Sequence, residues 1–341
     1  MKHMKFDDVL DLDKLPYFTK SEGKLFLKKE YIPQSGIIDS HTHLGWWYLF
    51  GRPINLSKKT KETLYFFPEK DNPVDFTQYT AFDYLPQNKK RARLETVRAA
   101  IDSSGYSSTH TIPNRLEEMN RLGIKKSVVL TIDFPVISHN SDSVLHAIKK
   151  NEESKKRLDV YVSLHPLEQN KEKKLKEFIK KGARGIKLHP QIQMFKPTRK
   201  GAYEIYELAL QYKLPILFHT GLSPISPRWQ QKYVEFSLFE KVIKDFPKNT
   251  FILGHSGVLD YKRAIEIARG RENIFLELSG QPPSIITDMI KLNGHDNLLY
   301  GSDWPYYPSV LPLAKVFLAT EGMKKEVREA ILQGNARRLG I

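Results

Sequence analysis

The sequence contains no cysteine, and this absence narrows the chemistry open to it. Disulfide bonds and thiolate metal ligands are excluded, so any metal site must use nitrogen and oxygen donors. No run of about 18 consecutive apolar residues occurs, which argues against a transmembrane helix. The N-terminal segment is charged and lacks the apolar centre of a signal peptide. We therefore expect a cytoplasmic protein without a membrane partner.

Acidic residues are in the minority: 39 Asp and Glu stand against 54 Lys and Arg, which gives a net charge of +15. Such a charge fits either a basic groove for nucleic acid or solvated helix faces. Most basic residues are interleaved with glutamate, and no helix-turn-helix, zinc-finger or RNP-like pattern occurs. We expect no nucleic-acid partner, and a positive field that attracts an anionic small-molecule substrate. The oligomeric state stays open, with a homo-oligomer as one option.

Short apolar segments alternate with helical patterns along most of the chain. Near-continuous apolar runs are typical of strands buried on both faces, as in a parallel sheet covered by helices. Eight such β–α units predict an α/β protein, specifically a (β/α)8 TIM barrel. The expected strands are 36–43, 127–133, 160–165, 184–189, 215–219, 250–255, 273–278 and 297–303.

The segment 44–112 interrupts this alternation after the first strand. It is rich in aromatic residues and shows clear helical character only at 94–101. Structureless segments of this length are uncommon inside compact domains and often serve as lids or binding loops. We predict a single domain, 1–341, with 44–112 as a lid or insertion. Trp46 and Arg52 follow the first strand directly, so we expect them to contact substrate.

The first strand ends in His41-Thr42-His43. Residues two apart in an extended chain point to the same side, so both imidazoles aim at one place. Two neutral imidazoles at this spacing suit a first-row divalent ion. Polar residues also end the other expected strands: Asp133, His165, Lys187, His189, His219, His255, Glu277 and Asp303. Active sites of TIM barrels lie at this face, so we expect these residues to converge.

This pattern resembles the amidohydrolase superfamily of metal-dependent TIM-barrel enzymes, and within it the branch that holds hydrolases and non-oxidative decarboxylases. The resemblance runs from about residue 36 to the end, apart from 44–112. The stretches that carry it are 38–43 (IDSHTH), 185–190 (GIKLHP), 216–221 (ILFHTG), 253–257 (LGHSG), 300–305 (YGSDWP) and 334–339 (GNARRL).

The resemblance implies roles for individual residues. His41, His43, His219 and Asp303 match the metal ligands, and Asp303 and His255 match the catalytic groups. Lys187, His189 and Glu277 are then candidates for substrate binding, with Glu277 also able to lie behind the ligands. We further expect Asp133 to support a ligand imidazole, His165 to be structural or in the pocket wall, and His110 to lie at the surface.

The resemblance also implies a divalent metal, with zinc preferred over manganese. We expect one ion, or two if Lys187 is carboxylated and bridges them, with His219 and His255 then binding the second. The expected reaction is cleavage of a C–O or C–N bond in a small carboxylated or cyclic substrate by a metal-activated water. The alternative is non-oxidative decarboxylation at the same site. A third alternative is a basic binding protein whose TIM barrel has lost its catalytic activity. The complete set of expected metal-binding residues argues against it.

Overall fold

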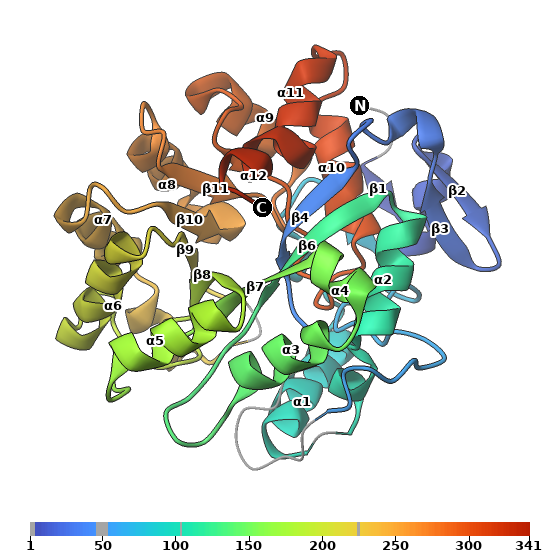
Figure 1. The fold of residues 1–341 in the computed structure, drawn as a ribbon. Helices are drawn as coiled ribbons and strands as arrows, with labels where there is room; N and C mark the ends of the chain where they lie inside the picture. The colour runs from blue at the N-terminus through green and yellow to red at the C-terminus, as the bar shows by residue number, and fades with distance from the viewer. Residues whose placement is uncertain (1–3, 46–53, 103, 224–225) are drawn as a thin grey trace.

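Eight parallel strands form the centre of the molecule, with helices around them (Figure 1). The computed structural model describes residues 4–45, 54–102, 104–223 and 226–341. The strand order in the sheet is β12-β11-β10-β9-β8-β7-β6-β4, which is the order of the chain. The strands are β4 (Ile37–Thr42), β6 (Ile124–Leu130), β7 (Leu158–Ser163), β8 (Ala183–Leu188), β9 (Ile216–His219), β10 (Phe251–Gly254), β11 (Ile274–Glu277) and β12 (Leu298–Leu299).

Helices connect these strands on the outside of the sheet, and the predicted TIM barrel is confirmed. The connecting and closing helices are α2 (Ile112–Arg121), α3 (Asn140–Lys149), α4 (Glu152–Arg157), α5 (Lys171–Lys180), α6 (Lys200–Gln211), α7 (Phe236–Asp245), α8 (Tyr261–Ala268), α9 (Pro283–Asn293), α10 (Val310–Ala319), α11 (Lys325–Glu329) and α12 (Asn335–Arg338). Among the described residues, no helix combines the length and the hydropathy that a membrane span requires.

Side chains alternate between two apolar layers along each strand. In β9, Leu217 packs into an inner cluster, whereas its neighbours Ile216 and Phe218 pack into the larger outer core. The inner cluster also holds Val128, Tyr161, Ile252, Phe275 and Leu299 from other strands. Both faces of the strands are therefore buried, which explains why their sequences are apolar throughout.

Backbone hydrogen bonds join the first strand to the end of the last one, and we call this junction the seam. It brings two segments together that lie about 260 residues apart in the chain. Because the seam reaches past the carboxyl ends of both strands, it extends to the face where a TIM-barrel site is expected. The bonds run from the amide of Ser40 to the carbonyl of Tyr300 (3.0 Å), from Asp303 to His41 (2.8 Å) and from His43 to Trp304 (2.6 Å).

A buried ion pair ties α2 to the seam. Arg115 Nη2 donates to Asp39 Oδ2 over 2.6 Å, and both side chains are fully buried. The other oxygen of Asp39 accepts from the backbone amides of His41 (3.1 Å) and Ser302 (2.9 Å). One carboxylate therefore holds β4, α2 and the segment after β12 together.

The N-terminal segment and the insertion pack outside the barrel. β1 (Lys5–Phe6) pairs with β5 (Val74–Asp75) of the insertion, and β2 (Phe18–Ser21) forms a hairpin with β3 (Lys24–Leu27). The ring of Tyr17 stacks on Phe317 of α10, with centroids 4.9 Å apart.

The helix in the insertion, α1 (Pro86–Ile101), begins eight residues before the predicted 94–101. Its first half is dominated by charged and polar residues with good helix propensity, so a helix forms there without any apolar period to reveal it. Trp46 and Arg52 lie outside the described residues, so their predicted contacts stay predictions.

We expect Arg115→Met to lower the free energy of unfolding by about 3–5 kcal/mol, because it leaves the Asp39 carboxylate buried without its counter-charge. Urea denaturation measures the change. Arg263→Met serves as the matched control, since Arg263 pairs with Glu240 at the surface and such pairs contribute at most about 1 kcal/mol. Equal losses in the two variants would contradict this role of Asp39.

Candidate active site

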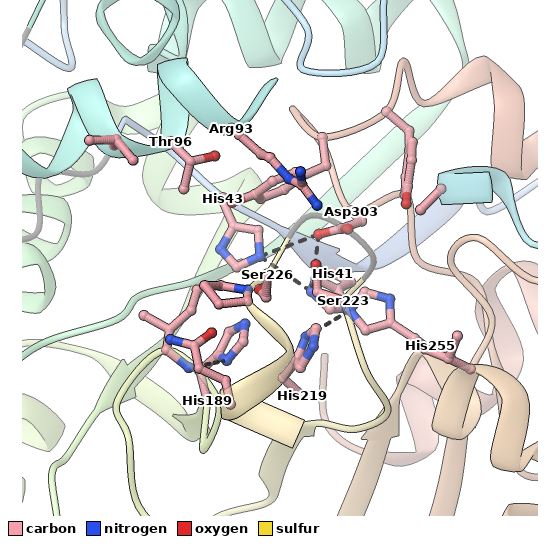
Figure 2. A pocket seen from close by; sticks show the side chains of 18 of the residues that line it. His41, His43, Arg93, Thr96, His189, His219, Ser223, Ser226, His255 and Asp303 are labelled. Atoms are coloured by element: carbon pink, nitrogen blue, oxygen red, sulfur yellow. Dashed lines mark hydrogen bonds and ion pairs between the residues drawn. The ribbon is translucent and has the colours of Figure 1, made fainter. Parts of the chain in front are cut away.

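His41, His43 and Asp303 meet at the seam (Figure 2). The Nε2 atoms of His41 and His43 lie 3.3 Å apart, and each lies 3.4 Å from Asp303 Oδ1. All three residues are buried. The seam hydrogen bond from the Asp303 amide to the His41 carbonyl explains this convergence, because it aligns the segment after β12 with the end of β4.

Three further histidines from neighbouring strand ends complete the group. His255 Nε2 lies 3.1 Å from His219 Nδ1, and His189 stacks on His219 with ring centroids 3.9 Å apart. His41, His255 and Asp303 each offer a ligand atom within 4.8 Å of the other two. The structure thus brings three of the four predicted ligands together, and the fourth, His219, contacts His255 beside them. His255, predicted as a catalytic group in a one-ion site and as a ligand of the second ion in a two-ion site, also lies where it could bind an ion with His41 and Asp303.

Hydrogen bonds behind the rings decide which nitrogens face inward as acceptors. His43 Nδ1 donates to the carbonyl of Leu130 (2.9 Å), and His41 Nδ1 donates to Glu277 Oε2 (2.7 Å). In the neutral rings the Nε2 atoms therefore carry lone pairs, which face each other and the Asp303 oxygen. His219 Nε2 is likewise buried, without a hydrogen-bond partner in the described part of the chain. Imidazole lone pairs and a carboxylate oxygen that converge in this way fit a cation, and these ligand types suit a divalent transition metal.

Burial keeps the histidines in the neutral form that binds metals. It lowers the pKa of His43 to about 3 and lowers the pKa of His41 and of His219 well below the usual value. The pKa of Asp303 is raised to about 7, chiefly because burial removes the hydration of its carboxylate.

The backbone is strained at two of these residues. Asp303 has a φ of 56° and His255 a φ of 60°, in the left-handed region that residues other than glycine rarely occupy. Each such position costs on the order of 1–3 kcal/mol and persists only where the surroundings over-determine it. Strain of this kind concentrates at functional sites, and here it falls on the two predicted catalytic residues.

A cavity of about 790 Å³ opens beside the histidines and Asp303, within the usual range for small-molecule sites. Its other walls are largely aromatic and aliphatic, and they include Tyr79, Tyr84 and Val97 of the insertion and Phe134, Tyr306 and Tyr307 of the barrel loops. Arg93 of α1 is the one Lys or Arg among the described residues that line it, and it extends toward the Asp303 side of the group (Figure 2). Sequence reasoning missed Arg93, because nothing distinguishes it from the other basic residues of α1.

Two residues expected to contact substrate lie elsewhere. Lys187 and Glu277 are fully buried and are not among the described residues that line the cavity. The Nζ atom of Lys187 has no hydrogen-bond partner in the described ranges, and Glu277 lies behind His41. His189, in contrast, lines the cavity as expected.

Two expectations outside the main group are wrong. Asp133 accepts from the backbone amides of Asn140 (2.6 Å) and Ser141 (3.1 Å) at the start of α3, and in the described contacts it supports no imidazole. His110 is buried and donates to the carbonyl of Leu64 (2.8 Å), because an earlier part of the insertion packs against it. His165, expected to be structural or in the pocket wall, is buried and donates to the carbonyl of Gln193 (3.0 Å).

The fold and the site define a TIM barrel with a candidate metal centre at the carboxyl ends of its strands. A family model described as Amidohydrolase matches residues 154–339, more than half of the chain. The chain belongs to this amidohydrolase family. No curated protein matches it.

Solved structures share the fold. An uncharacterised TIM-barrel protein from Bordetella bronchiseptica is 19% identical, with a TM-score of 0.61, over 89% of this chain and 97% of that one. A probable 2-pyrone-4,6-dicarboxylic acid hydrolase from Acinetobacter baumannii is 12% identical, with a TM-score of 0.55, over 90% and 100%. A 2,6-dihydroxybenzoate decarboxylase is 15% identical, with a TM-score of 0.57, over 89% and 98%.

We expect Lys187→Met to stabilise the metal-free protein by about 1–3 kcal/mol at pH 7, because it removes an unpartnered buried amine. Burial lowers the pKa of Lys187 from 10.5 to about 7, so between these values the unfolded chain binds the extra proton. The free energy of unfolding of the parent protein therefore rises with pH across this window. In Lys187→Met this contribution is absent, so the rise should be smaller. Urea denaturation from pH 7 to 10 measures both effects, with the exposed Lys156→Met as control. A loss of stability in Lys187→Met would contradict the expectation.

Proposed function

We propose that this protein is a metal-dependent hydrolase that cleaves a C–O or C–N bond of a small cyclic carboxylate. The observation that carries the proposal is the group at the seam, where two imidazole Nε2 atoms and a carboxylate oxygen lie within 3.4 Å of one another. Membership of the amidohydrolase family supports it.

The proposed ligands are His41, His43 and Asp303, with the fourth donor from the His219–His255 pair. We favour His219 as that donor, which leaves His255 for catalysis. A divalent ion held there would polarise a substrate carbonyl and lower the pKa of a water molecule. Zinc suits three imidazoles and one carboxylate, with manganese as the second choice. One ion is favoured, and a second would require a carboxylated Lys187.

Asp303 and His255 are the proposed proton-transfer groups. The Asp303 carboxylate lies at the centre of the group, where it can accept a proton from the attacking water and then return it. His255 is close enough to His41 and Asp303 to act on the same substrate group. Its Nε2 would polarise the carbonyl or protonate the leaving group when the ring carries the proton.

The cavity walls support the proposed substrate class. Flat aromatic and aliphatic surfaces favour a ring, and Arg93 offers a fork of donors that matches a carboxylate. The names of two structurally similar proteins agree with this class, since each contains the name of a cyclic carboxylic acid.

Decarboxylation is the alternative, and the apolar cavity walls favour it. A carboxylate against such walls is poorly hydrated, which promotes loss of CO2. Assaying lactones and aryl carboxylic acids side by side separates the two reactions. Ring opening of a lactone supports the hydrolase, whereas CO2 release without hydrolysis overturns it. The proposal also includes the cytoplasmic location and the single domain, 1–341, that the sequence predicts.

We expect Asp303→Asn to reduce kcat about 10²–10⁴-fold while the fold is retained, because the amide cannot accept a proton. Circular dichroism checks the fold and turnover of the best lactone or aryl acid checks the activity. Near-normal turnover would remove Asp303 from its assigned role.

We expect Arg93→Met to raise KM for a carboxylated substrate about 10–100-fold, because a charge-assisted hydrogen bond contributes about 1.5–3 kcal/mol. A matched substrate whose carboxylate is replaced by an amide should be unaffected. Arg98→Met is the control, since Arg98 lies on the same helix, is half exposed and faces Glu95 and Asp102. Equal effects of Arg93→Met on both substrates would contradict the carboxylate assignment.

A further inference from the structure

Glu277 ends β11 and collects hydrogen bonds from three parts of the site. Its Oε2 atom accepts from His41 Nδ1 (2.7 Å), from the His255 backbone amide (3.0 Å) and from Ser279 Oγ (2.9 Å). Its Oε1 atom accepts from the Ser279 amide (2.6 Å). The side chain is fully buried, so these groups replace its hydration. Four donors on one carboxyl group fit the ionised form, which only accepts.

The ionised Glu277 determines which atom donates in each hydrogen bond between Ser279 and its neighbours. Ser279 has one hydroxyl proton, and it goes to Glu277 because the carboxylate cannot donate. Ser279 Oγ must then accept from His255 Nδ1, which lies 2.8 Å away. His255 Nδ1 therefore carries the ring proton, and its Nε2 is left with the lone pair that lies near His219. Glu277 selects the same tautomer in His255, through Ser279, that it selects directly in His41.

We propose that Glu277 is a positioning residue that sets the tautomers of two histidines from different strands, His41 and His255, so that both Nε2 atoms offer lone pairs to the site. Among the residues that the structure describes, neither Nδ1 atom has another hydrogen-bond partner. The role in metal affinity rests on the proposed function. The tautomer assignment does not rest on the proposed function, because it concerns the metal-free protein.

Close packing holds the carboxylate in place. A Cβ atom built on Gly301 would lie 2.1 Å from Glu277 Oε1 and 2.8 Å from the Cβ atom of His41. Glycine at 301 therefore leaves room for the carboxylate directly beside the first ligand. A side chain so confined keeps one orientation, which is what fixing a tautomer requires.

Two variants test the proposal in the metal-free, histidine-15N-labelled protein. Glu277→Gln removes the negative charge and one of the two acceptor oxygens, so we expect the Nδ1–H tautomers of both His41 and His255 to be less populated. Ser279→Ala cuts only the indirect branch, so His255 alone should change. Imidazole 15N chemical shifts report the tautomers. Titration with zinc against a chelator reports affinity, which should fall about 10–100-fold in Glu277→Gln, as for other groups that support metal ligands.

Asp133→Asn is the matched control, because it removes another buried strand-end carboxylate whose described partners include no histidine. It should leave both tautomers and the zinc affinity unchanged. Unchanged shifts of His41 and His255 in Glu277→Gln would overturn the proposal, as would zinc affinity within twofold of the parent. If Glu277→Gln does not fold, Ser279→Ala decides: a change confined to His255 supports the proposal and no change overturns it. Absence of zinc binding in the parent, with the tautomers as described, would count against the proposed function alone.

Discussion

Closure of the barrel at the seam is the constraint on which the site depends. Backbone hydrogen bonds between the end of β4 and the segment after β12 set the distance between Asp303 and the two histidines of the first strand. They are supported by Asp39, which binds backbone amides on both sides and the guanidinium of Arg115. Without closure, the proposed ligands would lie at opposite edges of an open sheet.

Burial then gives the clustered groups their properties. Removed from water, imidazoles stay neutral and a carboxylate holds its proton more tightly, as the shifts at His43 and Asp303 show. Neutral rings bind a cation only if their lone pairs face it, so the hydrogen bonds behind the rings matter as much as the rings themselves. Glu277 accepts the hydrogen bond behind His41 directly and supports the one behind His255 through Ser279. The Leu130 carbonyl accepts the hydrogen bond behind His43.

Reactive and recognition groups come from different parts of the chain. The carboxyl ends of the strands supply the histidines and Asp303, held by the hydrogen-bonded sheet. The insertion contributes Arg93, Tyr79 and Tyr84 to the opposite walls of the cavity. In such an arrangement the walls can change without disturbing the candidate metal centre, which is how one barrel supports many substrates.

The sequence by itself determined the eight strands and the polar residues at their ends, because apolar runs and their boundaries are local properties. It could not reveal that Arg93 faces the cavity, since α1 carries no apolar period to orient it. Only the tertiary structure placed Lys187 and Glu277 behind the cavity wall, buried His110 under the insertion and assigned Asp133 to α3. Burial, tautomers and pKa shifts arise from contacts between residues tens to hundreds of positions apart, and no local pattern encodes them.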